Sequence, residues 1–385
     1  MTRVTGRTRS MAERKVRVLV GTRKGAYIAE SDARRRNWKV QPVAHAAADV
    51  FHVTADPRHP GTLYSAANSV FWGPILYRSA NWGKTWKEIT TPLTPPQKER
   101  KPSFEDFPNS PRRPVVNLWH IAPGHASEPK TVFIGVDPHM LFRSDDQGAS
   151  WAPVAGINEH STKSQWNPGA GGPCMHTILI DPRDARRMYV GLSAAGTFRS
   201  DDAGEHWRPT NQRVHAPFQP NPYPEVGQCV HHVALDAADP DIAYRQDHGG
   251  MYVNRHAMDG NWERIGKLKG GPKDDFGFAT TSSPTTPGRA YFVPLTGMAR
   301  TTPNGGLQVW EWSEAHRRWK ILMSPKLFPG DYGVQREGLS SDALTPAGLY
   351  VGTTTGQLVM SPDAGRSWRQ VPFQFPGIHS VEAVS

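Results

Sequence analysis

The sequence predicts an all-β protein: a seven-bladed β-propeller of four-stranded blades in which the C-terminal strand completes the first blade. Three observations lead to this fold class. The chain of 385 residues is rich in turn formers, with 36 Gly and 35 Pro. One eight-residue turn motif occurs four times, and tryptophans recur roughly every 55 residues, which is typical of internal repeats. Because 385 divided by seven also gives about 55, one closed repeat architecture explains the length better than several separate domains.

The turn motif has the pattern S-x-D-x-G-x-[ST]-W, and we call its four copies the box turns. A short carboxylate or amide accepts hydrogen bonds from the backbone of such a turn, and glycine supplies a residue with positive φ. Because apolar runs flank each copy, each turn is expected to join two antiparallel strands. We interpret these residues as folding devices and assign none to a site. The copies are Ser79–Trp86, Ser144–Trp151, Ser200–Trp207 and Ser361–Trp368, with Asn81 and His206 as departures from the pattern.

A four-stranded unit surrounds each box turn. Two further apolar strands precede each motif, and three degenerate copies of the unit end at Trp38, Trp262 and Trp319, so seven tryptophans lie in register. Sheets repeated in this way bury their faces by radial closure. Residues 16–22 (VRVLVGT) match the second strand of a unit, whereas the C-terminal IHSVEAVS has no blade of its own. We therefore expect residues 16–385 to form one propeller domain, closed by the C-terminal strand.

Composition excludes several other classes of protein. The sequence contains no apolar stretch of the ~18 residues that a membrane span requires, and its N-terminus lacks the apolar core of a secretory signal. Thirteen Trp, 14 Phe and 10 Tyr provide too much apolar surface for a disordered chain. Only Cys174 and Cys229 are present, so no disulfide framework or cysteine metal motif is expected. This pattern favours a cytoplasmic protein in which any metal is held by His or carboxylate.

The formal net charge of +10 does not by itself indicate nucleic-acid binding. Five basic residues and one acidic residue fall within residues 1–15, so +4 of the total belongs to a segment that we expect to be a disordered tail. Met11 within it is a second possible start. Since no helix-turn-helix, zinc-finger or RNA-recognition signature is present, we expect no specific nucleic-acid partner and no membrane partner.

The box turns resemble the Asp-box (BNR) repeats of the sialidase-like propellers, and the resemblance covers the whole folded chain. That superfamily includes exo-α-sialidases and other glycoside hydrolases, sortilin-type receptors and photosystem-assembly factors, so the resemblance implies a fold more specifically than a function. True sialidases open with an Arg-Ile-Pro motif and bind the substrate carboxylate with three arginines. Here the opening motif is missing, and the nearest basic residue is Arg23 in Gly-Thr-Arg-Lys-Gly. The three-arginine site therefore cannot be transferred residue by residue.

Long connections indicate which face of the propeller carries a site. Residues 90–117, 155–174, 208–229, 266–275 and 324–337 each precede an expected inner strand, on the face opposite the box turns. Loops of this length in a compact domain are usually functional and would wall an axial pocket for a small molecule or sugar. Phe104, Phe107, Trp166, Phe218, Tyr223, Phe328 and Tyr332 are possible lining residues. The expected substrate-binding residues are Arg23, Arg336, Trp166, Tyr332 and His139.

Histidines recur where inner strands begin, and these positions converge at the mouth of the channel. Neutral imidazole is a common ligand of Zn, Fe, Cu or Ni, so the pattern favours a divalent metal at an axial His cluster. The alternative is that these rings hydrogen-bond neighbouring strands or buried water. His176 and His231 lie one residue earlier in register than His52 and His232, and strand parity allows only one of His231 and His232 to face a given point. The candidate metal ligands are His52, His120, His176, His231 and His232, with His379 as a further candidate in the closing strand.

Three functions remain open at the level of sequence. The first is a cytoplasmic enzyme of hydrolase or lyase type, with or without metal assistance, in which Glu337, His248 and Asp247 are the catalytic candidates. The second is a sialidase-like glycoside hydrolase with paired carboxylates across the axial pocket. The third is a non-catalytic interaction or assembly platform. An enzyme needs a concave, polar-lined cavity, whereas a platform needs a broad exposed patch.

Overall fold

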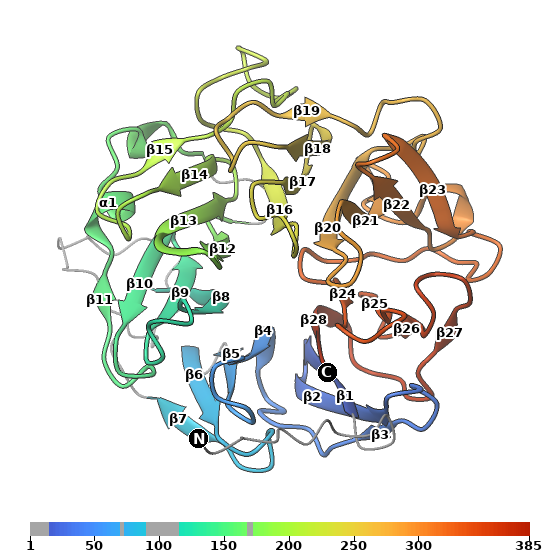
Figure 1. Cartoon of the computed structure of the whole chain (residues 1–385). Helices are drawn as coiled ribbons and strands as arrows, with labels where there is room; N and C mark the ends of the chain where they lie inside the picture. Colours follow the sequence, from blue (N-terminus) through green and yellow to red (C-terminus); the bar gives the residue numbers. More distant parts are fainter. Residues whose placement is uncertain (1–14, 70–72, 90–114, 168–171) are drawn as a thin grey trace, which may run out of the picture.

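The protein is a seven-bladed β-propeller of antiparallel four-stranded sheets, as the sequence predicts (Figure 1). The computed structural model describes residues 15–69, 73–89, 115–167 and 172–385. The expected tail at residues 1–15, except for Lys15, therefore lies outside the described residues, as do Phe104 and Phe107. None of the helices in the described ranges is long and apolar enough to cross a bilayer.

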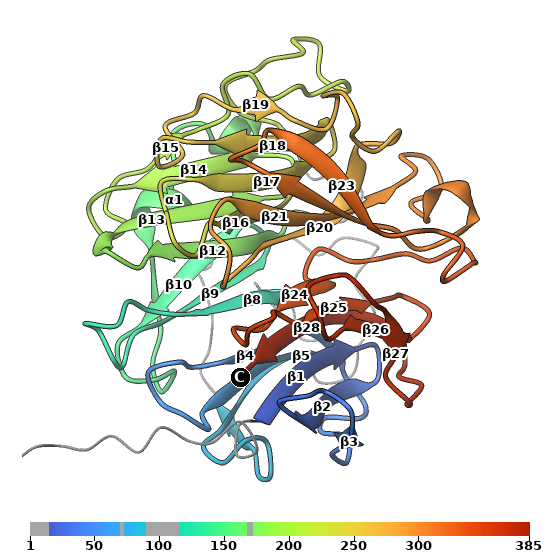
Figure 2. The ribbon, with the colours of Figure 1, turned by 45° about the vertical axis from the view of Figure 1, so that its right-hand side comes forward.

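The C-terminal strand closes the ring by completing blade 1. It pairs antiparallel with the first strand, with Val20 opposite Val381, and it also lies beside the inner strand of blade 7 (Figure 2). Ile378 and Val381 are buried there, so the closing strand contributes to the core as well as to the hydrogen-bond ladder. From the axis outward, blade 1 consists of β28 (Ile378–Val384), β1 (Lys15–Thr22), β2 (Gly25–Asp32) and β3 (Lys39–Val40).

The other six blades follow in chain order, each from its inner to its outer strand. Blade 2 contains β4 (Asp49–Ala55), β5 (Leu63–Ser69), β6 (Gly73–Ser79) and β7 (Lys87–Ile89). Blade 3 contains β8 (Asn117–Pro123), β9 (Val132–Asp137), β10 (Met140–Ser144) and β11 (Ala152–Pro153). Blade 4 contains β12 (Met175–Asp181), β13 (Asp184–Leu192), β14 (Gly196–Ser200) and β15 (Arg208–Pro209).

Blades 5 to 7 complete the ring. Blade 5 contains β16 (Val230–Leu235), β17 (Ala243–Asp247), β18 (Gly250–Asn254) and β19 (Glu263–Arg264). Blade 6 contains β20 (Phe276–Ser282), β21 (Arg289–Leu295), β22 (Val309–Ser313) and β23 (Arg318–Met323). Blade 7 contains β24 (Leu339–Ser341), β25 (Leu349–Gly352), β26 (Leu358–Ser361) and β27 (Arg369–Gln370). Within the described ranges, three short helices interrupt the connections: α1 (Ala155–Asn158), η1 (Lys163–Gln165) and η2 (Pro303–Gly305).

Each box turn joins the third and fourth strands of its blade, as expected. In blade 3 the Ser144 hydroxyl donates to Asp146 Oδ1 at 2.8 Å and accepts from the Gly148 N–H at 2.7 Å. Asp146 Oδ1 in turn accepts from the Ser150 N–H at 2.8 Å. Gln147 and Gly148 both have positive φ, 62° and 88°, so the turn needs two consecutive left-handed residues rather than the glycine alone. The turns thus define one face of the propeller, which we call the box face, and the opposite face is the loop face.

The seven tryptophans in register fill the seven interfaces between blades. Each belongs to a different apolar cluster, and each cluster combines residues of two adjacent blades. Trp262 is the most deeply placed, at 1% exposure, and its indole N–H donates to the Thr210 carbonyl of blade 4 at 2.7 Å. The repeated tryptophan therefore holds neighbouring blades together, which explains its spacing of one per blade.

A β-bulge recurs near the start of the inner strands and decides which side chains face the axis. Pairing registers shift between Val50 and His52 in β4, Leu118 and His120 in β8, and Val230 and His232 in β16. A bulge places two residues opposite one on the partner strand and so redirects the side chains on either side of it. The histidines that follow the bulge converge on the axis, where they meet a carboxylate of blade 7.

Candidate functional site

Two cavities lie along the propeller axis, one on each face, and Glu337 contributes to the lining of both. The loop-face cavity has a volume of about 520 Å³. The box-face cavity has about 790 Å³. The loop-face cavity is lined by Arg23, Phe51, Trp119, His176, Phe278, Ala299, Arg300, Thr301, Asp331, Gly333, Val334, Gln335, Arg336, Glu337, Thr354 and His379. The polar residues lining the box-face cavity include His52, Thr54, Arg58, His120, His125, His232, Thr281, Glu337, Ser340 and Glu382.

Glu337 lies between the cavities because the chain enters the inner strand of blade 7 at this point. Its carbonyl accepts from the Val381 N–H at 2.8 Å, which fixes the backbone against the closing strand. Its carboxylate accepts from His120 Nδ1 at 3.1 Å and from His232 Nε2 at 3.2 Å. These rings come from blades 3 and 5, so three blades contribute to one buried carboxylate–imidazole cluster.

Opposite charge controls the protonation of this cluster. Burial alone would raise the pKa of Glu337, but His232 and His120 outweigh burial and hold that pKa well below its usual range. Burial disfavours the charged form of His232 and by itself would lower its pKa. The Glu337 charge outweighs burial and raises the pKa of His232. A carboxylate that stays ionised beside a proton-carrying imidazole is a combination suited to acid–base or nucleophilic chemistry.

His52 belongs to the same cluster, but its tautomer does not suit a metal ligand. Its ring stacks on that of His120 at 4.3 Å, and its Nδ1 accepts from the Ile121 N–H at 3.1 Å. Burial lowers the pKa of His52 to about 3, so the ring is neutral and its remaining proton lies on Nε2. Ligand atoms of His52, His120 and Glu337 lie within 4.8 Å of one another. Because Nε2 carries the proton and Nδ1 is occupied, this set does not fit a metal without loss of a backbone hydrogen bond.

A second carboxylate, Glu382 on β28, lines the box-face cavity. Its Oε1 accepts from the Ala55 N–H of β4 at 2.9 Å. Burial raises the pKa of Glu382 to about 7, and the nearby Glu337 charge acts in the same direction. Their surroundings thus lower the pKa of Glu337 and raise that of Glu382. Such a pair suits a site in which the ionised carboxylate acts as base or nucleophile and the protonated carboxyl acts as acid.

The loop-face cavity presents three arginines. The Arg336 guanidinium lies 5.7 Å from the Trp119 ring centroid and 5.5 Å from that of Phe278, and the residue is only 9% exposed. Its Nε is buried without a hydrogen-bond partner, and Arg336 forms no ion pair with any described residue. Arg23 and Arg300 reach the same cavity from turns of blades 1 and 6. A buried cation that forms no ion pair favours an anionic ligand at this position.

The structure brings together eight of the residues predicted for a site. Glu337, His52, His120 and His232 form the axial cluster, whereas Arg23, Arg336, His176 and His379 line the loop-face cavity. Only one of the two adjacent histidines faces the axis, as strand parity predicts: His232 bonds Glu337, whereas His231 bonds the Gly277 carbonyl.

Other predicted residues lie apart from the axial cluster. His176 and His231 occupy the bulged position itself; the His176 ring nitrogens bond Thr177 Oγ1 and the Val230 carbonyl, and His231 lies beside Cys229 and His248. Asp247 pairs with Arg245 at 2.5 Å and lines neither cavity. The remaining three predicted substrate-binding residues bond within the protein and line neither axial cavity: Trp166 to Thr162, Tyr332 to Pro329 and His139 to Ser193.

Three residues of these sites are not predicted from the sequence. Arg300 lies in the connection between β21 and β22, outside the five long segments expected to wall the site, and nothing in its local sequence marks it. Glu382 lies three residues after His379 on the closing strand, but a register shift against β1 leaves His379 as a bulge, so strand alternation in the sequence does not mark Glu382. Cys229 precedes a predicted histidine by two residues, but without a second nearby cysteine it forms no recognisable metal motif.

Neither a protein-family model nor a curated protein matches the sequence. Solved structures match the fold. A GH74 xyloglucanase from Xanthomonas campestris has a TM-score of 0.64 and 17% identity over 97% of this chain and 52% of that one. A putative 6-phosphogluconolactonase from Bacteroides fragilis has a TM-score of 0.56 and 11% identity over 98% and 100%. YCF48 bound to a D1 peptide has a TM-score of 0.51 and 12% identity over 86% and 84%.

These neighbours establish the class of protein as a seven-bladed β-propeller, with glycoside hydrolases and a lactonase-like enzyme among its structural neighbours. The chain spans about half the length of the xyloglucanase that it matches. At identities of 11–17% the likeness concerns the fold alone, since one fold can carry unrelated functions.

Proposed function

We propose that this propeller is an enzyme of hydrolase or lyase type that binds a small anionic molecule in the loop-face cavity and acts on it with Glu337. The observation that carries the proposal is the buried Arg336 guanidinium, which forms no ion pair with any described residue although Asp331 and Glu337 line the same cavity. Arg23 and Arg300 add two further cations. A carboxylate or phosphate group is the ligand chemistry that an arginine fork and stacked aromatic rings recognise best.

Glu337 would handle the proton of the bound molecule. Its ionised carboxylate faces the cavity and can serve as base or nucleophile, while His232 and His120 hold its two oxygens in place. This follows the usual design in which a reactive group is oriented by partners bonded to it. His52 Nδ1 accepts from the Ile121 N–H, so the proposed chemistry involves no metal at this position.

Ligand binding and turnover test the proposal separately. Thermal shift with phosphate, citrate and phenyl phosphate should raise the Tm of the wild type, because a ligand at ~100 times its Kd stabilises by about 2.7 kcal/mol. Arg336→Met should abolish the shift, while Arg318→Met on the exposed outer strand β23 should retain it. Glu337→Gln should bind the anion and lose turnover. If no anion binds, or if Arg336→Met binds as well as wild type, the proposal fails and the interaction platform becomes the better hypothesis.

A glycoside hydrolase is a second candidate, favoured by the two carboxyls of the box-face cavity. Glu337 is ionised, and burial raises the pKa of Glu382 to about 7, so the pair offers the nucleophile or base and the acid that glycoside hydrolysis requires. Fluorogenic glycosides assayed with wild type, Glu337→Gln and Glu382→Gln test this function. Hydrolysis that both variants lose would support it, and inactivity of the wild type on all sugars would exclude it.

A further inference from the structure

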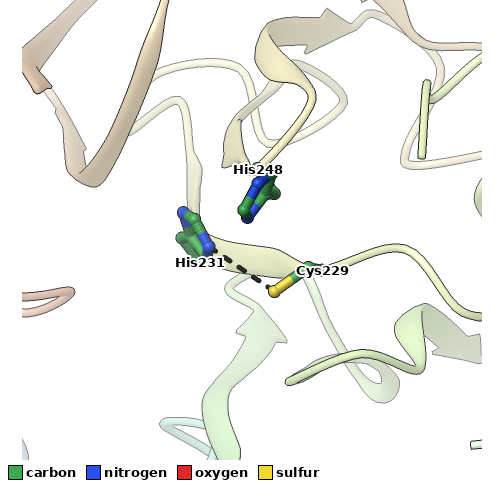
Figure 3. Close-up of side chains that lie close together, drawn as sticks. All are labelled: Cys229, His231 and His248. Carbon is green, nitrogen blue, oxygen red and sulfur yellow. Dashed lines mark hydrogen bonds between the residues drawn. The ribbon is translucent and has the colours of Figure 1, made fainter. Parts of the chain in front are cut away.

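We propose that Cys229, His231 and His248 form a zinc site on the loop face of blade 5, separate from the axial cluster. Cys229 directly precedes β16, His231 occupies the bulge of β16, and His248 lies in the turn between β17 and β18 (Figure 3). Figure 3 shows the three side chains directed toward a common point. Their ligand atoms all lie within 4.8 Å of one another.

The spacing of the ligand atoms suits a tetrahedral metal. Cys229 Sγ lies 3.5 Å from His231 Nε2. A tetrahedral Zn²⁺ with Zn–S near 2.3 Å and Zn–N near 2.05 Å requires its sulfur and nitrogen ligands to be about 3.5 Å apart. The distance between Cys229 Sγ and His231 Nε2 therefore already equals the distance between two ligands of a tetrahedral zinc ion.

The tautomer of His231 leaves the correct nitrogen free. Its Nδ1 donates to the Gly277 carbonyl of β20 at 2.6 Å, so in the neutral ring the lone pair is on Nε2, which faces Cys229. A hydrogen bond from the distal ring nitrogen to a backbone carbonyl is the usual outer support of a metal-bound histidine. This distinguishes His231 from His52, whose metal-facing nitrogen carries the proton.

His248 is positioned by the backbone and left without a competing partner. The backbone N–H of His248 donates to the Cys229 carbonyl at 2.9 Å, which ties the β17–β18 turn to the segment that carries the cysteine. Its ring lies 5.8 Å from that of His231 and forms no hydrogen bond with any residue in the described part of the chain. Phe218 and Phe276 pack on it, 5.3 and 5.1 Å away between ring centroids. A free ring nitrogen is thus held beside the cysteine in a largely apolar shell.

The donor set determines the class of metal. One thiolate and two imidazoles favour zinc and exclude the oxygen-seeking Mg²⁺ and Ca²⁺. The adjacent carboxylate, Asp247, accepts from Arg245 through Oδ2 and from the Gly249 N–H through Oδ1, and it is not part of the ligand group. Three protein ligands leave one coordination position for water or another small ligand, as in zinc sites that act on or bind an exogenous molecule.

Cobalt provides a direct probe of the site in the full chain. Chelator-treated protein titrated with Co²⁺ should bind one equivalent and develop a thiolate-to-cobalt charge-transfer band with strong tetrahedral d–d absorption, and Zn²⁺ should displace it. Cys229→Ala and His248→Ala should weaken binding by on the order of 100-fold or more, since even outer-shell partners contribute 10–100-fold. Cys174→Ala is the matched control: this second cysteine is buried and belongs to none of the ligand clusters, so its loss should leave the spectrum unchanged.

Further variants and competitor metals locate the site and identify its metal. His120→Ala should retain the cobalt spectrum, and loss of the spectrum in this variant would place the metal at the axial cluster and overturn the proposal. Displacement of cobalt by Cu²⁺ with no displacement by Zn²⁺ would overturn the assignment to zinc. In a Cys174→Ala background, Zn²⁺ should also protect Cys229 from a thiol reagent, a readout that does not depend on the folding of the ligand variants. Unchanged reactivity, or a band that survives in Cys229→Ala, would refute the site.

Discussion

Glu382→Gln should change the dependence of stability on pH, and the size of the effect follows from the burial of this carboxyl. Burial raises the pKa of Glu382 from 4.5 to about 7. A carboxyl whose folded pKa exceeds its unfolded pKa stabilises the fold fully below the unfolded value and loses that contribution as pH rises through the folded value. The folded protein is therefore penalised progressively between about pH 4.5 and pH 7 by the ionisation of one side chain.

The magnitude is about 3 kcal/mol above pH 7, because a shift of about 2.5 units corresponds to 1.36 kcal/mol per unit. The same relation gives a penalty of roughly 1 kcal/mol at about pH 5, so the pH-dependent part is about 2.5 kcal/mol. Glutamine resembles the protonated acid, and its amide oxygen can still accept from the Ala55 N–H that Glu382 binds at 2.9 Å. The variant should therefore gain stability over the wild type mainly at alkaline pH.

Urea unfolding followed by tryptophan fluorescence measures the effect at both pH values. The difference in free energy of unfolding between Glu382→Gln and wild type should grow by about 2.5 kcal/mol from about pH 5 to about pH 8.5. Glu88→Gln on the exposed outer strand β7 is the matched control and should show no such growth. A difference that is the same at both pH values would refute the reasoning, because it would mean that Glu382 ionises as easily in the folded as in the unfolded chain.

Three further predictions concern the architecture. Deletion of residues 377–385 removes β28 with its buried Ile378 and Val381 and should lower the Tm by roughly 10 °C or more; an unchanged melting curve would contradict closure by this strand. Trp262→Ala should cost about 3–5 kcal/mol in urea unfolding, since the residue is 1% exposed and bonds across two blades, and a cost near zero would argue against its role between blades. Asp146→Ala removes the acceptor of the Ser150 N–H in a box turn and should cost about 1 kcal/mol, with the blade intact by circular dichroism; full unfolding would show that the turns do more than join strands.

The fold is predictable because its determinants are local and repeated. Each box turn uses side chains within one eight-residue segment, and each register tryptophan recurs once per blade, so the sequence displays both without knowledge of distant contacts. Glu337 is predictable for a related reason, since its place directly before an inner strand puts it near the axis. The closing strand follows from counting strands at the two ends.

Which histidines face the axis and which face the loop-face cluster is less predictable, because it depends on a bulge of one residue. His231 and His232 are neighbours in sequence, yet the bulge directs His232 to Glu337 and His231 to Cys229. The offset is visible when the inner strands are aligned, but a bulge leaves no fixed residue signature that would tell which ring faces the axis. Arg300 escapes prediction because the residues around it in space are distant in the chain and are brought together by the closure of the ring. Cys229 has its partners within blade 5 but lies in no recognisable ligand motif.

The pairing of β28 with β1 also sets the order in which the molecule can be completed during synthesis. β1 is made early, but the strand that lies on its axial side follows all six other blades, so blade 1 keeps an open edge while the chain emerges. An unpaired strand edge invites association with other chains. Prolonged pauses in translation before residue 378 should therefore expose β1 to chaperones or to neighbouring nascent chains, and synthesis of β28 would end that exposure.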